Sequence, residues 1–214
     1  AAACLPQGDF LHLSGPETPF PETGTISVIG PGTGLGVALF HRFGGGYHVQ
    51  ATEGGHMDFA PVDAVDDAIL HRLRARHRRV SVERVVSGPG IVAIHAALAA
   101  LEKREVAEMD DRTIWPRGLS GDDPLCAAAA EHFCQSLGSV SGDIALVHGA
   151  GGVVIAGGLG FRIRKALAAS GFAARFAFKG RYEQRMAGLP VKLITHPQPG
   201  LFGAAAAFAK EHGA

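Results

Sequence analysis

The chain has 214 residues, 47% of them hydrophobic, which is enough for one large domain with a substantial core, or for one domain and part of another. Twenty basic and twenty acidic residues give a formal net charge of zero, so no overall field favours nucleic acid or a membrane surface as a partner. The three cysteines are scattered without a CxxC pair, which argues against a disulfide framework and a structural zinc site. No apolar run approaches the roughly 20 residues of a membrane span, and no signal-peptide pattern is present. These features predict a cytoplasmic protein.

The first part of the chain predicts strands joined by tight glycine turns. Residues 25–30 (TISVIG) have the pattern of a short buried strand, and the glycine-rich GPGTGLG follows directly. A second strand is expected over 37–43, and the GGG at 44–46 can turn it into a third strand, YHVQATE. The stretch 25–53 therefore predicts three strands joined by two turns.

After residue 60 the hydrophobic period becomes helical. Val65, Ala68, Ile69 and Leu73 fall on one helical face. The basic segment 72–79 (RLRARHRR) lies on this pattern, and we favour a solvated helix face over a site for an anionic partner.

The next segments predict a strand followed by two helices. ERVVSGPG, from Glu83 to Gly90, predicts a strand and a turn. Pro89 is well placed to begin a helix that continues through residue 107. SGDDP supplies caps for another helix, from about Pro124 to Leu137 or beyond, and Cys126 and Cys134 are expected to be core residues of that helix.

The last third alternates strands and helices. GVVIAGGLG predicts a short buried strand that ends in glycines, and RIRKALAASG predicts a helix that stops at Gly171. PVKLITH then predicts the last strand, and PGLFGAAAAFAKEHG predicts a closing helix. Taken in order, these elements predict an α/β architecture with a mixed sheet and a single core.

The segment ATEGGHMDFAP concentrates polar chemistry in an otherwise apolar chain. Glu53, His56 and Asp58 have no recognised metal-ligand spacing, and no strained GxSxG turn offers a serine nucleophile. Glu53 and Glu83 adjoin apolar strand sequence, where an unpaired carboxylate is costly to bury. With His56 they would suit a neutral polyhydroxyl ligand, because an ionised carboxylate accepts several hydroxyl hydrogen bonds. A structural role for His56 stays open, and Asp58 is expected to orient His56 or the local loop.

The glycine clusters are ambiguous by themselves. GPGTGLG fits neither the P-loop spacing nor GxGxxG, and it is either an anion-binding nest with the Thr33 hydroxyl or a hairpin without a ligand. Two other segments, Gly157-Gly158 and the small-residue helix start PGLFGAAA, are equally open. Their small residues would let either a flat ligand or a closely packed helix lie against the backbone.

The chain resembles the bacterial glucokinases in five segments that follow one another in the sequence: GPGTGLGVA, EGGHMDFAP, ERVVSGPG, GGVVIAGG and PGLFGAAA. The resemblance covers the whole chain and implies the large lobe of a ribonuclease-H-like fold, the actin/hexokinase ATPase fold, with a mixed sheet flanked by helices. The related repressor/kinase group carries a cysteine-rich zinc motif that is absent here, so the chain is more similar to the plain glucokinases.

The resemblance also implies roles for particular residues. The family phosphorylates glucose at its 6-hydroxyl with ATP, the first step of glycolysis, with Mg²⁺ held mainly through ATP and water, often as a homodimer. The sugar ligands are then Glu53, His56 and Glu83. The nucleotide residues are Gly32, Thr33, Gly34 and Gly36 at the phosphates, Gly157 and Gly158 at the adenosine, and Gly200 and Gly203 at the adenine.

Two family features are not found in the sequence. The first phosphate loop, Asp-x-Gly-Gly-Thr, and the Asn-Asp pair that supplies the catalytic base are both missing, so the base is expected upstream of Ala1. Residues 1–24 are then the connection from a missing N-terminal lobe, and residues 25–214 the large lobe, whose C-terminal helix packs back on the small lobe. This chain alone should be inactive. The alternatives are a non-catalytic sugar- or nucleotide-binding module of the same fold, and an anion-binding α/β domain without a sugar role.

Overall fold

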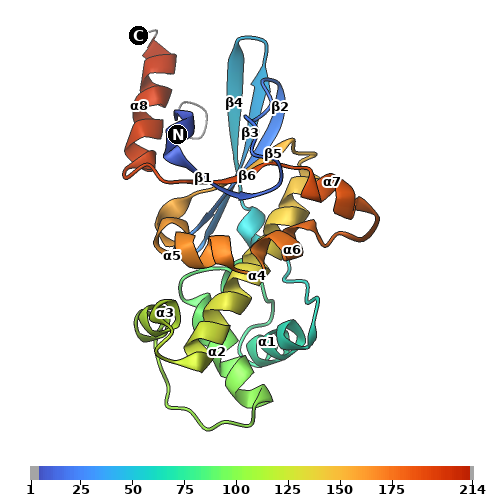
Figure 1. Ribbon diagram of the computed structural model, residues 1–214, viewed down its shortest axis with the longest axis vertical. Helices are drawn as coiled ribbons and strands as arrows, with labels where there is room; N and C mark the ends of the chain where they lie inside the picture. The colour runs from blue at the N-terminus through green and yellow to red at the C-terminus, as the bar shows by residue number, and fades with distance from the viewer. Residues whose placement is uncertain (1–4, 213–214) are drawn as a thin grey trace.

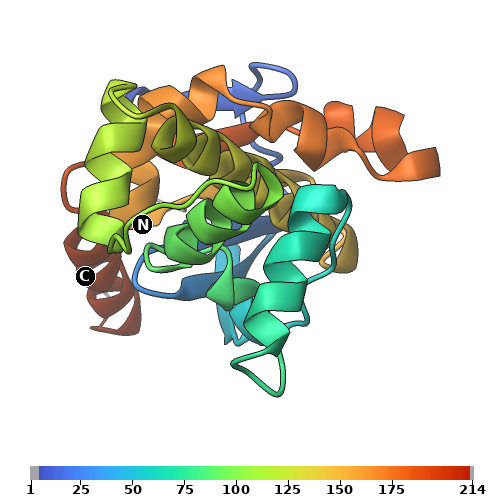
Figure 2. The same cartoon turned by 90° about the horizontal axis from the view of Figure 1, so that it is seen from below.

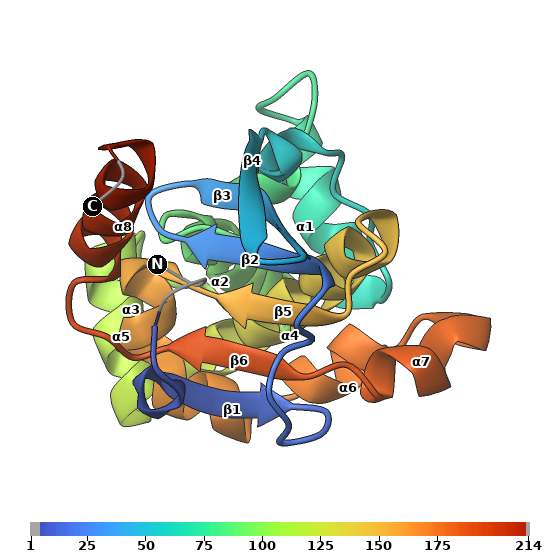
Figure 3. The ribbon, with the colours of Figure 1, turned by 90° about the horizontal axis from the view of Figure 1, so that it is seen from above.

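The protein is built around one mixed sheet of six strands in the order β1-β6-β5-β2-β3-β4, seen face-on in Figure 3. A computed structural model describes residues 5–212. The central strands β2, β5 and β6 are parallel, whereas β1 pairs antiparallel with β6, β3 with β2, and β4 with β3. The strands are β1 (Phe10–Ser14), β2 (Gly24–Pro31), β3 (Leu35–Phe43), β4 (Gly46–Thr52), β5 (Gly152–Ile155) and β6 (Val191–Ile194).

Eight helices flank the sheet in the described part of the chain, and α4 runs through the middle of the molecule (Figure 1). They are α1 (Ala64–Arg74), α2 (Gly90–Leu101), α3 (Asp111–Ser120), α4 (Pro124–Val147), α5 (Gly157–Ala169), α6 (Phe172–Ala177), α7 (Glu183–Ala187) and α8 (Pro199–His212). Four 3₁₀ turns accompany them: η1 (Gln7–Asp9), η2 (Gly54–His56), η3 (Val82–Arg84) and η4 (Gly180–Tyr182). Within residues 5–212 no helix combines the length and the apolar character needed to cross a membrane.

The core lies on both faces of the sheet because side chains alternate along each strand. On β5, Val153 and Ile155 join the large cluster under the helices, while Val154 points to the other face. There it meets a smaller cluster with Ile26 and Phe40. The α8 helix faces this second side across a cavity.

Most predicted elements are confirmed, including the two hairpins and the helices around residues 64–74 and 124–147. Asp63 and Asp123 cap α1 and α4 by accepting hydrogen bonds from first-turn amides, and Pro124 stands in the first turn of α4. Cys126 and Cys134 are buried, as expected.

The predicted strand at ERVVSGPG is wrong. The segment forms the 3₁₀ turn η3, in which the amides of Val85 and Val86 bond to the Val82 carbonyl instead of to a neighbouring strand. Val85 and Val86 are nevertheless fully buried. A short apolar run can fill the space between helices as readily as it can fill a sheet, and periodicity cannot distinguish the two.

Three other features differ from expectation. The α2 helix ends at Leu101, not at residue 107, because Lys103 adopts a left-handed φ of 51°. The α3, α6 and α7 helices are not anticipated, and Pro116 inside α3 disguises its pattern. Phe10–Ser14, within the stretch expected to be a connection, is an edge strand of the same sheet.

Candidate functional site

The β2–β3 turn lies at the centre of the candidate site. Pro31 pairs with Leu35 across it, and the Gly32 amide donates to the Gly34 carbonyl at 2.8 Å. The Gly32 carbonyl accepts a hydrogen bond of 2.7 Å from the Gly88 amide. The Gly88 carbonyl in turn accepts from the indole Nε1 of the buried Trp115 at 3.0 Å. Hydrogen bonds therefore connect the turn to the SGPG loop (residues 87–90) and, through that loop, to α3.

Glu83 binds the same turn from η3. Its Oε2 accepts a hydrogen bond from the Leu35 amide at 2.8 Å. A Cβ atom at Gly34 would lie 2.3 Å from Oε2, so the carboxylate occupies space that only glycine leaves free. No group among residues 5–212 donates to the second oxygen, Oε1. Glu83 thus holds the turn with one oxygen, while the other oxygen has no hydrogen-bond donor in the described part of the chain.

His56 lies on η2 and Glu53 directly precedes it, and η2 packs on β3. A Cβ atom at Gly55 would come within 2.3 Å of the Leu35 carbonyl oxygen, so glycine is required for this close approach. Glu53 Oε2 and His56 Nε2 are 3.8 Å apart, and their side chains are 90% and 58% exposed. Glu83 and the η2 turn therefore both contact Leu35, whereas the Glu53 and His56 side chains are open to solvent.

Asp58 has a different role from these residues. Its Oδ1 accepts from Arg79 Nε at 2.6 Å, and its backbone forms an isolated bridge with Ser81. This pairing fixes the local loop, one of the two roles expected of Asp58.

Part of the predicted nucleotide set shares one cavity of about 260 Å³. Cβ atoms at Gly32 and Gly158 would meet open space. The α5 helix begins at Gly157 without a side-chain cap from Ala156, so its first-turn amides have no capping partner there. A helix N-terminus of this kind favours phosphate. The cavity is lined by Gly32, Thr33, Gly88, Pro89, Asp111, Gly158, Leu159 and Arg162.

The remaining nucleotide residues lie elsewhere. Gly157, Gly200 and Gly203 line a separate, largely apolar cavity of about 380 Å³ between the sheet and α8, together with Phe40 and Tyr47. Gly157 needs to be glycine, because its φ is +85° and a Cβ atom would lie 2.8 Å from the Pro31 carbonyl oxygen. Gly36 pairs with Gly30 inside the sheet and lines neither cavity.

Sequence reasoning missed two charged residues of the smaller cavity, Asp111 and Arg162. The Arg162 guanidinium lies over the Trp115 ring, 5.5 Å from its centroid, and Trp115 in turn donates to the Gly88 carbonyl. Neither residue belongs to a glycine motif, so no local pattern in the sequence points to them.

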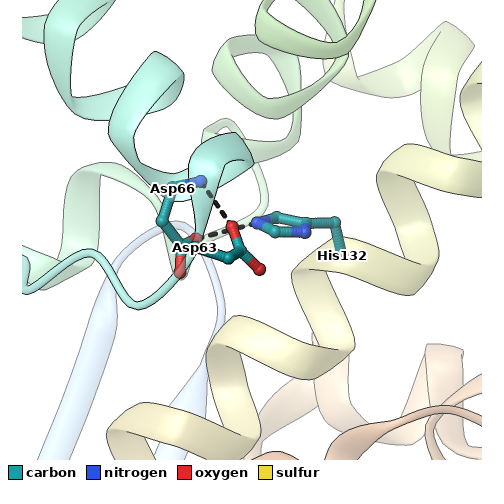
Figure 4. A group of neighbouring side chains, drawn as sticks. All are labelled: Asp63, Asp66 and His132. Carbon is teal, nitrogen blue, oxygen red and sulfur yellow. Dashed lines mark hydrogen bonds and ion pairs between the residues drawn. The ribbon is translucent and has the colours of Figure 1, made fainter.

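A second polar cluster, Asp63, Asp66 and His132, has the composition of a metal site (Figure 4). His132 Nε2 lies 2.8 Å from Asp66 Oδ1, and Asp63 accepts from the Asp66 amide at 2.9 Å. The Arg175 guanidinium contacts both carboxylates, supplying the positive charge that a metal would otherwise bring. The cluster therefore ties α1 to α4 and α6.

The buried cysteines should be chemically inert in the folded chain. Burial raises the pKa of the Cys134 thiol to about 12, and burial followed by the charge of Asp123 raises the pKa of Cys126. A raised pKa keeps the thiol neutral until the pH approaches it, and only the thiolate reacts. We expect iodoacetamide at about pH 8, near the ordinary thiol pKa, to leave both unmodified until urea is added. Peptide mass spectrometry checks this, and equal labelling rates with and without urea would contradict the burial.

Comparison with known proteins agrees with the geometry. A profile of the glucokinase family matches residues 1–211. A glucokinase of Zymomonas mobilis subsp. mobilis is 54% identical over 201 residues, covering 94% of this chain and 62% of the relative. The crystal structure of a glucokinase from an Antarctic psychrotroph is 37% identical with a TM-score of 0.87, covering 96% of this chain and 64% of that one.

A more distant structure shares only the fold. It is a ROK family glucokinase from Streptomyces griseus in complex with glucose and AMPPNP, 17% identical, with a TM-score of 0.50 over 87% of this chain and 61% of that one. The chain spans about three fifths of the length of the curated relatives it matches, 62% for the Zymomonas protein. Its mixed sheet flanked by helices is the predicted fold class, and the chain belongs to the glucokinase family.

Proposed function

We propose that this chain is the sugar- and nucleotide-binding large lobe of an ATP-dependent glucokinase, which phosphorylates glucose at its 6-hydroxyl. The observation that carries the proposal is the hydrogen bond from the Leu35 amide to Glu83. This hydrogen bond directly connects Glu83, which is predicted to bind sugar, with the β2–β3 turn, which is predicted to hold phosphate. A sugar at Glu83 and a phosphate at Thr33 would then be held by one rigid unit, as in-line transfer requires.

The sugar side of the site works by hydrogen bonding. Glu53 and the free Oε1 of Glu83 would accept from sugar hydroxyls, and His56 would donate to or accept from a third. An ionised acceptor strengthens each bond and fixes the orientation of the sugar. The glucose held in the Streptomyces structure supports this ligand class.

The nucleotide side would hold phosphate through backbone amides and a cation. The α5 N-terminus at Gly158, the Thr33 hydroxyl and Arg162 surround the smaller cavity, which suits the phosphates of ATP. The apolar cavity at Gly200 and Gly203 would receive the adenine. The AMPPNP of the Streptomyces structure supports this use. Bound Mg²⁺, held mainly through the phosphates and water, would neutralise charge during transfer.

The catalytic base is proposed to lie outside this chain. The sugar 6-hydroxyl must lose a proton to a carboxylate. Glu83 already holds the Leu35 amide, and the relatives are longer than this chain, which covers 62% of the Zymomonas protein. We further propose that the parent acts in the cytoplasm at the first step of glycolysis, as a homodimer.

A coupled assay of ADP formation tests the proposal. This chain alone should show no glucose-dependent turnover, and joining it to the N-terminal segment of the Zymomonas glucokinase should produce turnover. Turnover by this chain alone would contradict the external base. A folded chimera that binds glucose and ATP without turnover would favour the alternative, a non-catalytic binding module.

A further inference from the structure

A further cavity, of about 750 Å³, lies next to the smaller cavity and shares Thr33 with it. It is formed where α1 and α2 lie side by side, the teal and green helices of Figure 2. Thr33 and Pro89 line both cavities, so the two are neighbours separated by the turn and the SGPG loop. Glu53, His56 and Gly158 do not line the larger one.

The wall of this cavity is strongly basic. Arg72, Arg76 and Arg84 line it, together with His71 and His77. Its one carboxylate, Glu83, holds the Leu35 amide. In the described part of the chain no carboxylate lies within ion-pair distance of these three arginines, whereas Arg79, Arg104 and Arg175 all have acidic partners. Three guanidinium groups therefore face one space without a counter-ion.

The rest of the lining favours a compact, partly apolar ligand. Leu73, Val92 and Ala96 provide an apolar surface. The α2 helix begins at Gly90 on the cavity wall, and its preceding residue, Pro89, gives no side-chain cap. The positive end of the helix dipole adds to the field of the arginines. The cavity volume lies in the usual range for small-molecule sites, about 300–1,000 Å³.

We propose that this cavity binds a small phosphate monoester, at a site separate from the nucleotide phosphates. Guanidinium groups bind phosphate oxygens in a bidentate manner, and three of them suit a dianion. This revises the expectation that segment 72–79 is only a solvated helix face. The three arginines are outside the proposed sugar and nucleotide residues, although Thr33 and Glu83 of those sets also line the cavity.

His77 offers a spectroscopic readout of the same site. Its pKa is lowered, first by burial and then by the charges of Arg84 and Arg76. A bound dianion would offset both arginine charges and raise the pKa of His77. The other titratable or charged groups that face the cavity are His71, Arg72 and Glu83.

The test measures binding of inorganic phosphate and of glucose 6-phosphate to this chain by calorimetry. We expect the double variant Arg72→Ser/Arg76→Ser to weaken the binding of both ligands by about a hundredfold, since each lost charge-assisted hydrogen bond costs roughly tenfold, or about 1.4 kcal/mol. Arg74→Ser is the matched control, because Arg74 lies between Arg72 and Arg76 in the chain and is exposed, but does not line the cavity. The control should bind as the unmodified chain does.

Two results would overturn the site. Unchanged affinity in the double variant would mean that phosphate binds elsewhere, the nucleotide cavity included. An equal weakening in Arg74→Ser would mean a general surface-charge effect. Proton NMR of His77 gives an independent check: phosphate should raise the pKa of His77 in the unmodified chain and leave it unchanged in the double variant. An unmoved His77 in the phosphate-bound, unmodified chain would also count against the proposal.

Discussion

Replacing Glu83 by Gln should lower kcat/KM for glucose by the equivalent of about 2–4 kcal/mol in the chimera that carries the N-terminal segment of the Zymomonas glucokinase. The carboxylate acts in two places. Oε2 holds the Leu35 amide at 2.8 Å, and Oε1 is proposed to accept from a sugar hydroxyl. Removing the charge weakens both bonds. We therefore expect KM to rise for ATP as well as for glucose, measured by steady-state kinetics in the coupled assay.

Glu53→Gln separates the two roles. The Glu53 side chain is 90% exposed and does not bond to the β2–β3 turn. Its substitution should impair glucose kinetics and leave KM for ATP unchanged. If glucose kinetics are unchanged in both variants, neither glutamate binds sugar. If Glu53→Gln raises KM for ATP as much as Glu83→Gln does, the hydrogen bond between Glu83 and the Leu35 amide does not couple the sugar site to the nucleotide site.

Asp66→Asn should lower the free energy of unfolding by about 3 kcal/mol, the usual cost of breaking a buried ion pair from one side. The Asp66 side chain is 3% exposed, accepts from the Val62 amide, and contacts both His132 and Arg175. The asparagine amide has the same shape but leaves the Arg175 cation without half of its counter-charge. Urea denaturation followed by circular dichroism measures the change.

Asp67→Asn is the matched control for this effect. Asp67 is the next residue on α1 and is exposed. Its substitution should change the free energy of unfolding by no more than about 0.5 kcal/mol. Equal stabilities of the two variants would show that the cluster joining α1, α4 and α6 contributes little to the fold.

The sheet and its glycine turns could be predicted from the sequence because the information is local. Alternation in TISVIG, the GGG turn at 44–46 and the Asp123-Pro124 helix start each determine their structure within a few residues. The α3 helix could not be predicted in this way. Its Gly118 and Pro116 discourage a helix locally, yet Gly118 is required because a Cβ atom there would lie 2.6 Å from the Cys126 carbonyl oxygen of α4.

The candidate site was only partly predictable, because its contacts join residues that are far apart in the sequence. Glu83 and Leu35 are 48 residues apart, and nothing in either local sequence indicates their hydrogen bond. The predicted nucleotide glycines separate into two cavities because Gly157 and Gly158, although adjacent, face different sides of the fold. The three arginines at the larger cavity gather only when α1 and η3 pack against α2.

Calorimetric titration of this chain with glucose tests the account most directly. We predict a single saturable site for glucose, markedly weakened in Glu53→Gln and in Glu83→Gln and unchanged in Glu17→Gln, an exposed glutamate on the Pro-rich loop before β2. A chain that is folded by circular dichroism but releases no binding heat with glucose would contradict the sugar site. Binding that is equally strong in the Glu53 and Glu83 variants would contradict it as well.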